Sequence, residues 1–282
     1  MTMLAFHDAR VTLGGHCALD GVSLSFEAGE LVGIMGPNGA GKSTLLRAGA
    51  GLQRLDGGRV TVRERSIADW PRRDIARVLS FLPQGGTVHW PLSVRALVAL
   101  GRLPHHQPFA RAALADEVAI DAALRACEVE TLAERPVTHL SGGERARVLL
   151  ARALAAEAPI LFADEPFAQL DPSHQIHAME VLQATAHKGT LVLVVLHDLS
   201  VAARFCDRIV LLNEGRIVAD GTPDAVLTRE VLNQTFGVDA LIGRHGDARY
   251  VVPLTRNTSH VTSVKAEILP VTEKTGPPPA RD

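Results

Sequence analysis

The sequence predicts an α/β protein built on a mainly parallel sheet. Short, unbroken apolar runs alternate with stretches whose apolar residues recur at helical spacing. A strand that is apolar along its whole length is buried on both faces, which is typical of a parallel sheet covered by helices. The expected strands are 31–35, 78–82, 160–163, 191–196 and 208–212, and helices are expected within 42–50, 93–101, 118–128, 142–155, 175–186 and 223–236.

Three segments depart from this alternation. The first 26 residues alternate polar and apolar side chains around a Gly-Gly turn, which favours an antiparallel β layer beside the main sheet. Residues from about 90 to 155 carry helical patterns and no convincing strand, so we expect an inserted helical subdomain. From about residue 265 the chain is proline-rich and polar, which predicts a loose tail.

Composition narrows the possible functions. The chain has 282 residues, 46% of them hydrophobic, and a net charge of −2, so bulk charge gives no support to a nucleic-acid partner. Its three cysteines are far apart and form no zinc pattern, which favours a reduced, cytoplasmic protein. No signal-peptide pattern opens the chain, and no run approaches the roughly 18 apolar residues of a membrane helix. Any role at a membrane would therefore require a partner.

The stretch GPNGAGKST directly follows the expected strand 31–35 and opens a helix. This context identifies a phosphate-binding loop, because its glycines let backbone N–H groups converge on phosphate oxygens at a helix N-terminus. Lys42 should reach the β- and γ-phosphates, and the Ser43 hydroxyl should bind Mg²⁺. The expected nucleotide contacts are Gly36, Pro37, Asn38, Gly39, Ala40, Gly41, Lys42, Ser43 and Thr44.

A pair of carboxylates follows another buried strand in the stretch ILFADEP. The carboxyl ends of parallel strands face the ligand crevice, so Asp164 can hold Mg²⁺ there. Glu165 is then placed to orient and deprotonate an attacking water. A carboxylate base beside the magnesium aspartate favours hydrolysis of the nucleotide over transfer of its phosphate to a substrate.

A second candidate anion site lies in LSGGERARVLLARALA, where Ser141, Gly142 and Gly143 open a helix. These residues alone do not decide whether this helix end binds a separate anion or caps the nucleotide of a neighbouring subunit. With this stretch included, the sequence resembles the ATP-binding subunits of ABC transporters over about residues 3–240. The motifs stand in family order: Walker A (GPNGAGKST), the Q-loop Gln84, LSGGE, Walker B (ILFADEP), the D-loop AQLD ending at Asp171, and the H-loop His197.

The resemblance implies the P-loop NTPase fold of ABC ATPases over 1–240, with 241–282 as a C-terminal extension. It also implies a head-to-tail homodimer in which Ser141, Gly142 and Gly143 cap ATP bound to the partner's Walker A loop. In that arrangement His197 contacts the γ-phosphate and helps position the attacking water, and Gln84 touches Mg²⁺ and that water. Asp171 acts at the dimer interface.

Two positions differ from the family pattern. The aromatic residue that usually stacks on adenine is replaced by Leu13, and Tyr250 is the only tyrosine. Packing on the base would therefore be aliphatic or come from another residue, such as His16. The fifth residue of the signature is Glu144 in place of glutamine, which leaves the Ser-Gly-Gly segment intact.

A lone ATPase domain resembles bacterial importers whose permease is a separate chain. Residues 90–106 and 170–175 resemble the subfamily that serves siderophore, haem and cobalamin uptake, and an iron chelate is the favoured cargo. The implied partners are permease subunits and, indirectly, a periplasmic binding protein, with the chain on the cytoplasmic face of the inner membrane.

Alternatives are a cobalamin importer, an exporter with separate permeases, or a soluble ABC ATPase acting on DNA or ribosomes. The short segment between Gln84 and Ser141 leaves no room for the coiled coil of repair-type members. A metal site formed by His89, His105 and His106 is disfavoured against a solvated loop, because no carboxylate or cysteine joins these histidines.

Overall fold

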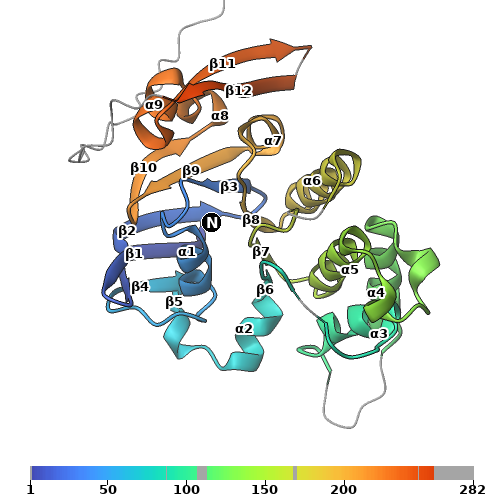
Figure 1. The fold of residues 1–282 in the computed structure, drawn as a ribbon. Helices are drawn as coiled ribbons and strands as arrows, with labels where there is room; N and C mark the ends of the chain where they lie inside the picture. The colour runs from blue at the N-terminus through green and yellow to red at the C-terminus, as the bar shows by residue number, and fades with distance from the viewer. Residues whose placement is uncertain (1, 87, 107–112, 168–169, 247, 257–282) are drawn as a thin grey trace, which may run out of the picture.

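The parallel strands of the central sheet all have their carboxyl ends on the same side of the sheet. A computed structural model describes residues 2–86, 88–106, 113–167, 170–246 and 248–256. Over these residues the largest sheet has the order β10-β9-β3-β8-β7-β6 (Figure 1). All neighbours from β9 to β6 are parallel, and β10 is antiparallel to β9. The strands are β3 (Leu31–Met35), β6 (Leu79–Leu82), β7 (Ile160–Ala163), β8 (Leu191–Val195), β9 (Arg208–Asn213) and β10 (Arg216–Gly221).

Strand β3 shows why an unbroken apolar run indicates a strand that is buried on both faces of the sheet. Val32 and Ile34 pack into a core with helix α1 (Lys42–Gly49), whereas Leu31 and Met35 pack into a second core. That second core includes buried side chains of α6 (Pro172–His187) and α7 (Leu199–Phe205). Successive strand side chains point to opposite faces, so both faces of this sheet are buried.

The expected N-terminal antiparallel layer is present, with the strand order β2-β1-β4-β5. Phe6 and Phe26 meet edge to face in the core that this layer shares with α1, with ring centroids 6.4 Å apart. A short 3-10 turn and helix α2 (Arg72–Val78) connect the layer to β6. The strands are β1 (Thr2–Leu13), β2 (His16–Glu27), β4 (Gly57–Val62) and β5 (Arg65–Ser66).

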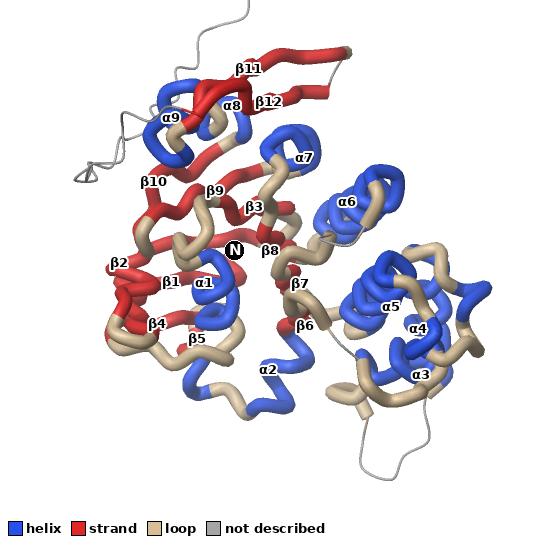
Figure 2. Tube along the Cα trace, in the orientation of Figure 1, coloured by secondary structure: helices blue, strands red, loops and turns tan. Residues whose placement is uncertain are grey.

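The expected helical subdomain consists of helices and loops within the described parts of 90–155 (Figure 2). Its helices are α3 (Val94–Ala99), α4 (Leu114–Ala126) and α5 (Gly142–Ala155), with short 3-10 turns at Leu100–Arg102, Glu130–Leu132 and Val137–His139. The apolar stripe of α5, which includes Val148 and Ala151, is buried in the core. In Figure 1 these helices lie together at one side of the molecule, away from α1.

The last described elements form a hairpin that packs on α7. The single helical pattern expected over 223–236 is two helices, α8 (Pro223–Val226) and α9 (Arg229–Phe236). They are separate because Thr228 leaves the helical conformation and caps α9 with its side chain. The hairpin β11 (Val238–His245) and β12 (Ala248–Arg256) follows, and Ser200 of α7 exchanges two 2.9 Å hydrogen bonds with the backbone of Val251.

The sequence did not predict β4, β5, α2 or β10. Strand β4 begins with two glycines, and α2 is seven residues rich in charge. Strand β10 is half-exposed at the sheet edge and carries no continuous apolar run.

The proposed domain limit after residue 240 falls within β11, and the tail expected from residue 265 lies outside the described residues. Among the described residues, no helix is long and apolar enough to span a membrane.

A buried ion pair in the helical subdomain gives a prediction about stability. Arg102 donates to Asp116 at 2.8 Å, and both side chains are 7% exposed. Replacing Asp116 with Ala should cost about 3 kcal/mol of unfolding free energy, because it removes the buried carboxylate partner of a buried guanidinium and leaves it the more exposed Glu157. Urea denaturation measures this cost. Asp121→Ala, which removes a half-exposed partner of Arg95, is the control and should cost at most about 1 kcal/mol.

The stability cost of Asp116→Ala should become smaller as the pH falls. The hydrogen bond from Arg102 lowers the pKa of the Asp116 carboxyl. The contribution of Asp116 is therefore complete above its unfolded pKa, about 4, and is lost as the pH falls through the lower folded value. The difference between wild type and Asp116→Ala should shrink in that acidic range. An equal cost at all pH values would contradict this assignment.

Candidate functional site

Three neighbouring strands each deliver one polar side chain two residues past their end. Gln84 follows β6, Glu165 follows β7, and His197 follows β8. The adjacent strand β3 ends at Met35 and leads directly into the glycine-rich loop. Because these strands are parallel and adjacent, all four segments meet at one edge of the sheet.

The glycine-rich loop lies between β3 and α1, where close packing requires glycine at two positions. A Cβ on Gly36 would lie 2.0 Å from the Leu212 carbonyl oxygen of β9, and a Cβ on Gly41 would lie 2.3 Å from that of Ala18 in β2. Gly41 also has a φ of 102°, which favours glycine, and it precedes α1 directly. The loop is therefore fixed against both sheets. Pro37, Asn38, Gly39 and Ala40 form its middle, and Lys42, Ser43 and Thr44 begin α1.

Lys42 is buried within this loop. Its Nζ donates to the carbonyl oxygens of Gly36 and Pro37, at 2.8 and 2.9 Å. Burial lowers the pKa of the Lys42 ammonium, opposed by the nearby Glu165 and Asp164 carboxylates. A cation held this way inside a loop of backbone N–H groups suits a bound polyphosphate.

Ser43 and Asp164 form a pair that fits a divalent cation. The Ser43 hydroxyl donates to Asp164 Oδ1 at 2.9 Å, while the buried Oδ2 has no hydrogen-bond partner. Burial raises the pKa of the Asp164 carboxyl, opposed by the hydrogen bond from Ser43, so a nearby cation would stabilise the ionised form. Hard oxygen donors with few protein ligands suit Mg²⁺ shared with substrate phosphates.

Glu165 lies at the centre of a polar cluster. Gln84 Nε2 donates to Glu165 Oε2, and His197 Nε2 lies 2.6 Å from Glu165 Oε1. Glu165 has a φ of 48°, an uncommon conformation for a residue with a side chain, and such strain is often found at functional sites. The structure thus brings together the three residues that the sequence assigned to the attacking water.

The Ser-Gly-Gly segment lies on a different part of the molecule. Ser141 caps α5: its hydroxyl accepts from the Glu144 N–H, and the Glu144 carboxylate accepts from the Ser141 N–H at 2.8 Å. Figure 1 shows α5 in the helical subdomain, apart from α1. Helix α5, which this segment opens, therefore lies apart from the helix that follows the phosphate loop. Glu144 takes part in the cap, which explains how glutamate serves at this position.

Asp171 caps α6. Its carboxylate accepts from the His174 N–H at 3.0 Å and lies 2.8 Å from His174 Nδ1. Its predicted role at a dimer interface stays a prediction. Two other D-loop residues, Ala168 and Gln169, lie outside the described residues.

The end of the β1–β2 hairpin is where we expect the adenine base of the nucleotide to bind. Leu13 and His16 are cross-strand partners there, and both are exposed. Tyr250 is far along the chain in β12, where its ring covers Gly243 of β11. Of the residues considered for packing on adenine, the hairpin end thus presents Leu13 and His16.

The structure corrects one detail and adds one feature. His105 and His106 are half-buried, with His105 Nε2 2.9 Å from the Ala156 carbonyl oxygen and His106 Nε2 3.3 Å from Asp116, so this is not a solvated loop.

The added feature is the turn between β9 and β10, where the Gly215 N–H donates to the Ala40 carbonyl at 3.1 Å. No local pattern marks this contact, because it joins residues far apart in the sequence.

Known proteins resemble this chain over most of its length. The family model described as ABC transporter matches residues 19–168. A hemin import ATP-binding protein, HmuV, of Rhodococcus jostii is 44% identical over 80% of this chain and 77% of its own length. The HmuV of Pseudomonas putida is 41% identical over 90% of this chain and 100% of its own.

Solved structures with a similar fold are also ABC transporter proteins. A metal-chelate type ABC transporter in an inward-facing conformation has a TM-score of 0.78 and 25% identity, covering 90% of this chain and 98% of its own. A dimeric bacterial ABC transporter cassette has a TM-score of 0.70 and 28% identity, covering 78% and 99%. With the phosphate loop, the Gln84–Glu165–His197 cluster and these relatives in agreement, the chain belongs to the ABC transporter family of ATP-binding proteins.

Proposed function

We propose that this chain is the ATP-hydrolysing subunit of an importer for haem or another iron chelate. Two copies would bind ATP between them and drive a separate permease. The observation that carries this proposal is the 41% identity to a hemin import ATP-binding protein over that protein's full length. The position of Glu165, between Gln84 and His197 at the edge of the sheet, supports hydrolysis as the reaction.

The reaction follows from the described side chains. Glu165 accepts a proton from a water that attacks the γ-phosphate in line, with Gln84 and His197 orienting the carboxylate and the water. Lys42 stabilises charge on the β- and γ-phosphate oxygens, for which it would exchange its carbonyl partners. Ser43, Asp164 and Gln84 would hold Mg²⁺, which supplies charge neutralisation on the phosphates when bound.

The site needs a second copy to be complete. Helix α5, which Ser141 caps, lies apart from α1 of the same chain (Figure 1), so the Ser-Gly-Gly segment would cap the nucleotide of the partner subunit. A two-fold, self-complementary interface forms two such sites at once. Asp171 would lie at this interface. The dimeric cassette among the similar structures supports this arrangement.

A surface pocket offers a route from a membrane partner to the site. It has a volume of about 280 Å³, and its lining includes Gln84 and Glu165 on one side and Arg145 and Leu149 of α5 on the other. A permease loop seated there would touch Gln84 and the helical subdomain together. We place the chain on the cytoplasmic face of the bacterial inner membrane, with a periplasmic binding protein delivering the cargo to the permease.

Reconstitution tests the cargo and the direction of transport. The chain is purified with the permease encoded beside it and placed in lipid vesicles. Haem, a ferric siderophore and cobalamin are each presented with the neighbouring binding protein. We expect haem or the siderophore to stimulate ATP hydrolysis and to be imported. Stimulation by cobalamin alone, net export, or failure to purify with any permease would contradict the proposal.

A further inference from the structure

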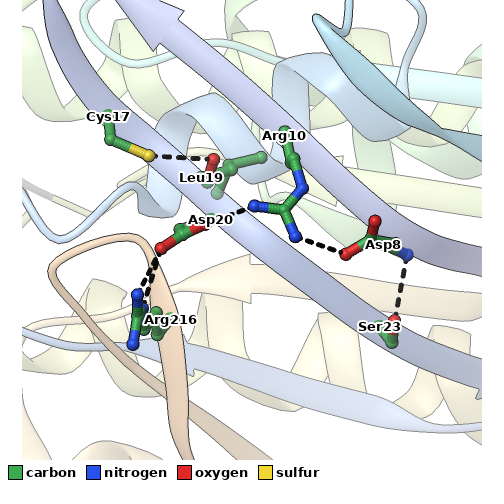
Figure 3. A network of polar contacts seen from close by, with 7 residues as sticks. All are labelled: Asp8, Arg10, Cys17, Leu19, Asp20, Ser23 and Arg216. Carbon is green, nitrogen blue, oxygen red and sulfur yellow. Dashed lines mark hydrogen bonds and ion pairs between the residues drawn. The ribbon is translucent and has the colours of Figure 1, made fainter. Parts of the chain in front are cut away.

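A chain of ion pairs crosses the antiparallel layer and reaches the β9–β10 turn (Figure 3). Arg10 of β1 donates to Asp20 of β2 at 2.7 Å and to Asp8 at 3.0 Å. Arg216 of β10 donates to Asp20 Oδ2 through Nε at 2.9 Å and through Nη2 at 2.6 Å. Asp20 is thus the shared acceptor of two arginines from different sheets. We call Asp8, Arg10, Asp20 and Arg216 the Asp20 network.

Backbone contacts connect this network to the phosphate loop. The Asp20 N–H donates to the Gly215 carbonyl at 2.9 Å, and the Gly215 N–H donates to the Ala40 carbonyl at 3.1 Å. The turn that begins β10 is therefore bound to β2 on one side and to the phosphate loop on the other. A Cβ on Gly215 would lie 3.0 Å from the Ala18 backbone, so the turn and β2 are in close contact.

The same strand β2 begins at the end of the hairpin where we expect the base. His16 is its first residue, and Asp20 stands four residues further along. Ala18, between them, provides the carbonyl against which Gly41 of the phosphate loop packs. Strand β2 therefore joins the expected adenine end of the site to the phosphate end. The Asp20 network holds β2 to the β9–β10 turn, which contacts the phosphate loop.

We propose that Asp20 is a positioning residue for ATP, acting through Arg216 and the β9–β10 turn to fix the phosphate loop relative to the β1–β2 hairpin. This inference rests on the proposed binding of ATP in that loop. Asp20 touches no substrate atom. It sets the spacing between two parts of the site, so it matters for ligands that span both parts.

The members of the network have unequal importance. Arg216 has one carboxylate partner among the described interactions, Asp20, whereas Arg10 bonds both Asp20 and Asp8. Asp8 is in turn fixed by its own N–H, which donates to the Ser23 hydroxyl at 2.9 Å. Loss of Arg10 leaves both hydrogen bonds from Arg216 to Asp20 Oδ2 in place. Loss of Arg216 removes the side-chain connection to the turn and leaves only the backbone hydrogen bond from Asp20 to Gly215.

The test compares two ligands. Asp20→Asn should weaken ATP, measured as KM and as Kd, by about twofold to fivefold, as expected for a half-exposed ion-pair network. The kcat should stay unchanged, because no group that touches the reacting atoms is altered. Inorganic tripolyphosphate, which contacts the phosphate loop alone, should inhibit the variant and the wild type equally. Arg216→Gln should reproduce these effects, and Arg10→Gln should have a smaller one.

The matched control is Asp224→Asn. Asp224 also accepts from two arginines, Arg244 and Arg249, but it lies in α8. Its loss should leave both ligands unaffected. Equal weakening of ATP and tripolyphosphate, or no weakening of ATP in Asp20→Asn and Arg216→Gln, would overturn the positioning role. Failure of the wild type to bind ATP at all would instead refute the proposed function.

Discussion

Replacing Glu165 with Gln should reduce steady-state ATP hydrolysis by about a hundredfold to a thousandfold, within the range expected for loss of a general base. Glutamine keeps the shape of the side chain and an oxygen for the hydrogen bond from Gln84. It cannot accept a proton from water. ATP binding should therefore persist, because Lys42 and the loop backbone, which would hold the phosphates, are unchanged.

Two measurements separate the loss of chemistry from the loss of binding. Radiolabelled phosphate release gives the turnover, and size-exclusion chromatography with ATP gives the fraction of paired subunits. The variant should accumulate as an ATP-bound dimer, because the step that reopens the pair is blocked. Near wild-type turnover would show that Glu165 is not the base.

Glu128→Gln is a matched control for this prediction. Glu128 is another glutamate with positive φ, 53°, and it lies in the helical subdomain. Its replacement makes the same chemical change in a similar backbone conformation. Turnover in this control should match that of the wild type. A comparable loss in both variants would point to a general effect of the substitution rather than to catalysis.

The sequence predicted the central strands well because the parallel sheet is buried on both faces. Strand β7, Ile160–Ala163, has the limits expected from its apolar run, and β3 likewise matches. Asp164 and Glu165 could also be assigned, because they directly follow a buried strand of the parallel sheet. Gln84 and His197 were assigned from their resemblance to the Q-loop and H-loop motifs. The cluster around Glu165 confirms that these residues meet.

Local patterns could not predict contacts between distant segments. The Asp20–Arg216 contact joins residues 196 positions apart, and neither residue belongs to a motif. Strand β10 was missed because half-exposed edge strands carry no distinctive hydrophobic run. A helical period also says nothing about a break of two residues, which is why α8 and α9 were expected to be continuous.

Mixing two inactive variants should restore ATP-dependent pairing, if the Ser-Gly-Gly segment caps the partner's nucleotide. In a Glu165→Gln background, Lys42→Ala removes the buried ammonium of the phosphate loop. Ser141→Arg fills the α5 N-terminus with a large side chain and removes the cap. Each variant alone should fail to form the ATP-bound dimer, because both of its sites carry the defect.

A mixed pair has a different distribution of defects. One site combines the defective loop of the first subunit with the defective cap of the second, and the other site combines an intact loop with an intact cap. Because neither variant pairs with itself, every ATP-bound pair in an equal mixture is mixed, so pairing should recover toward the level of the Glu165→Gln protein, with about one ATP per pair. If the cap acted within its own chain, both sites of every mixed pair would stay defective and no ATP-bound dimer would form. Recovery on mixing therefore requires that each nucleotide be held by two subunits.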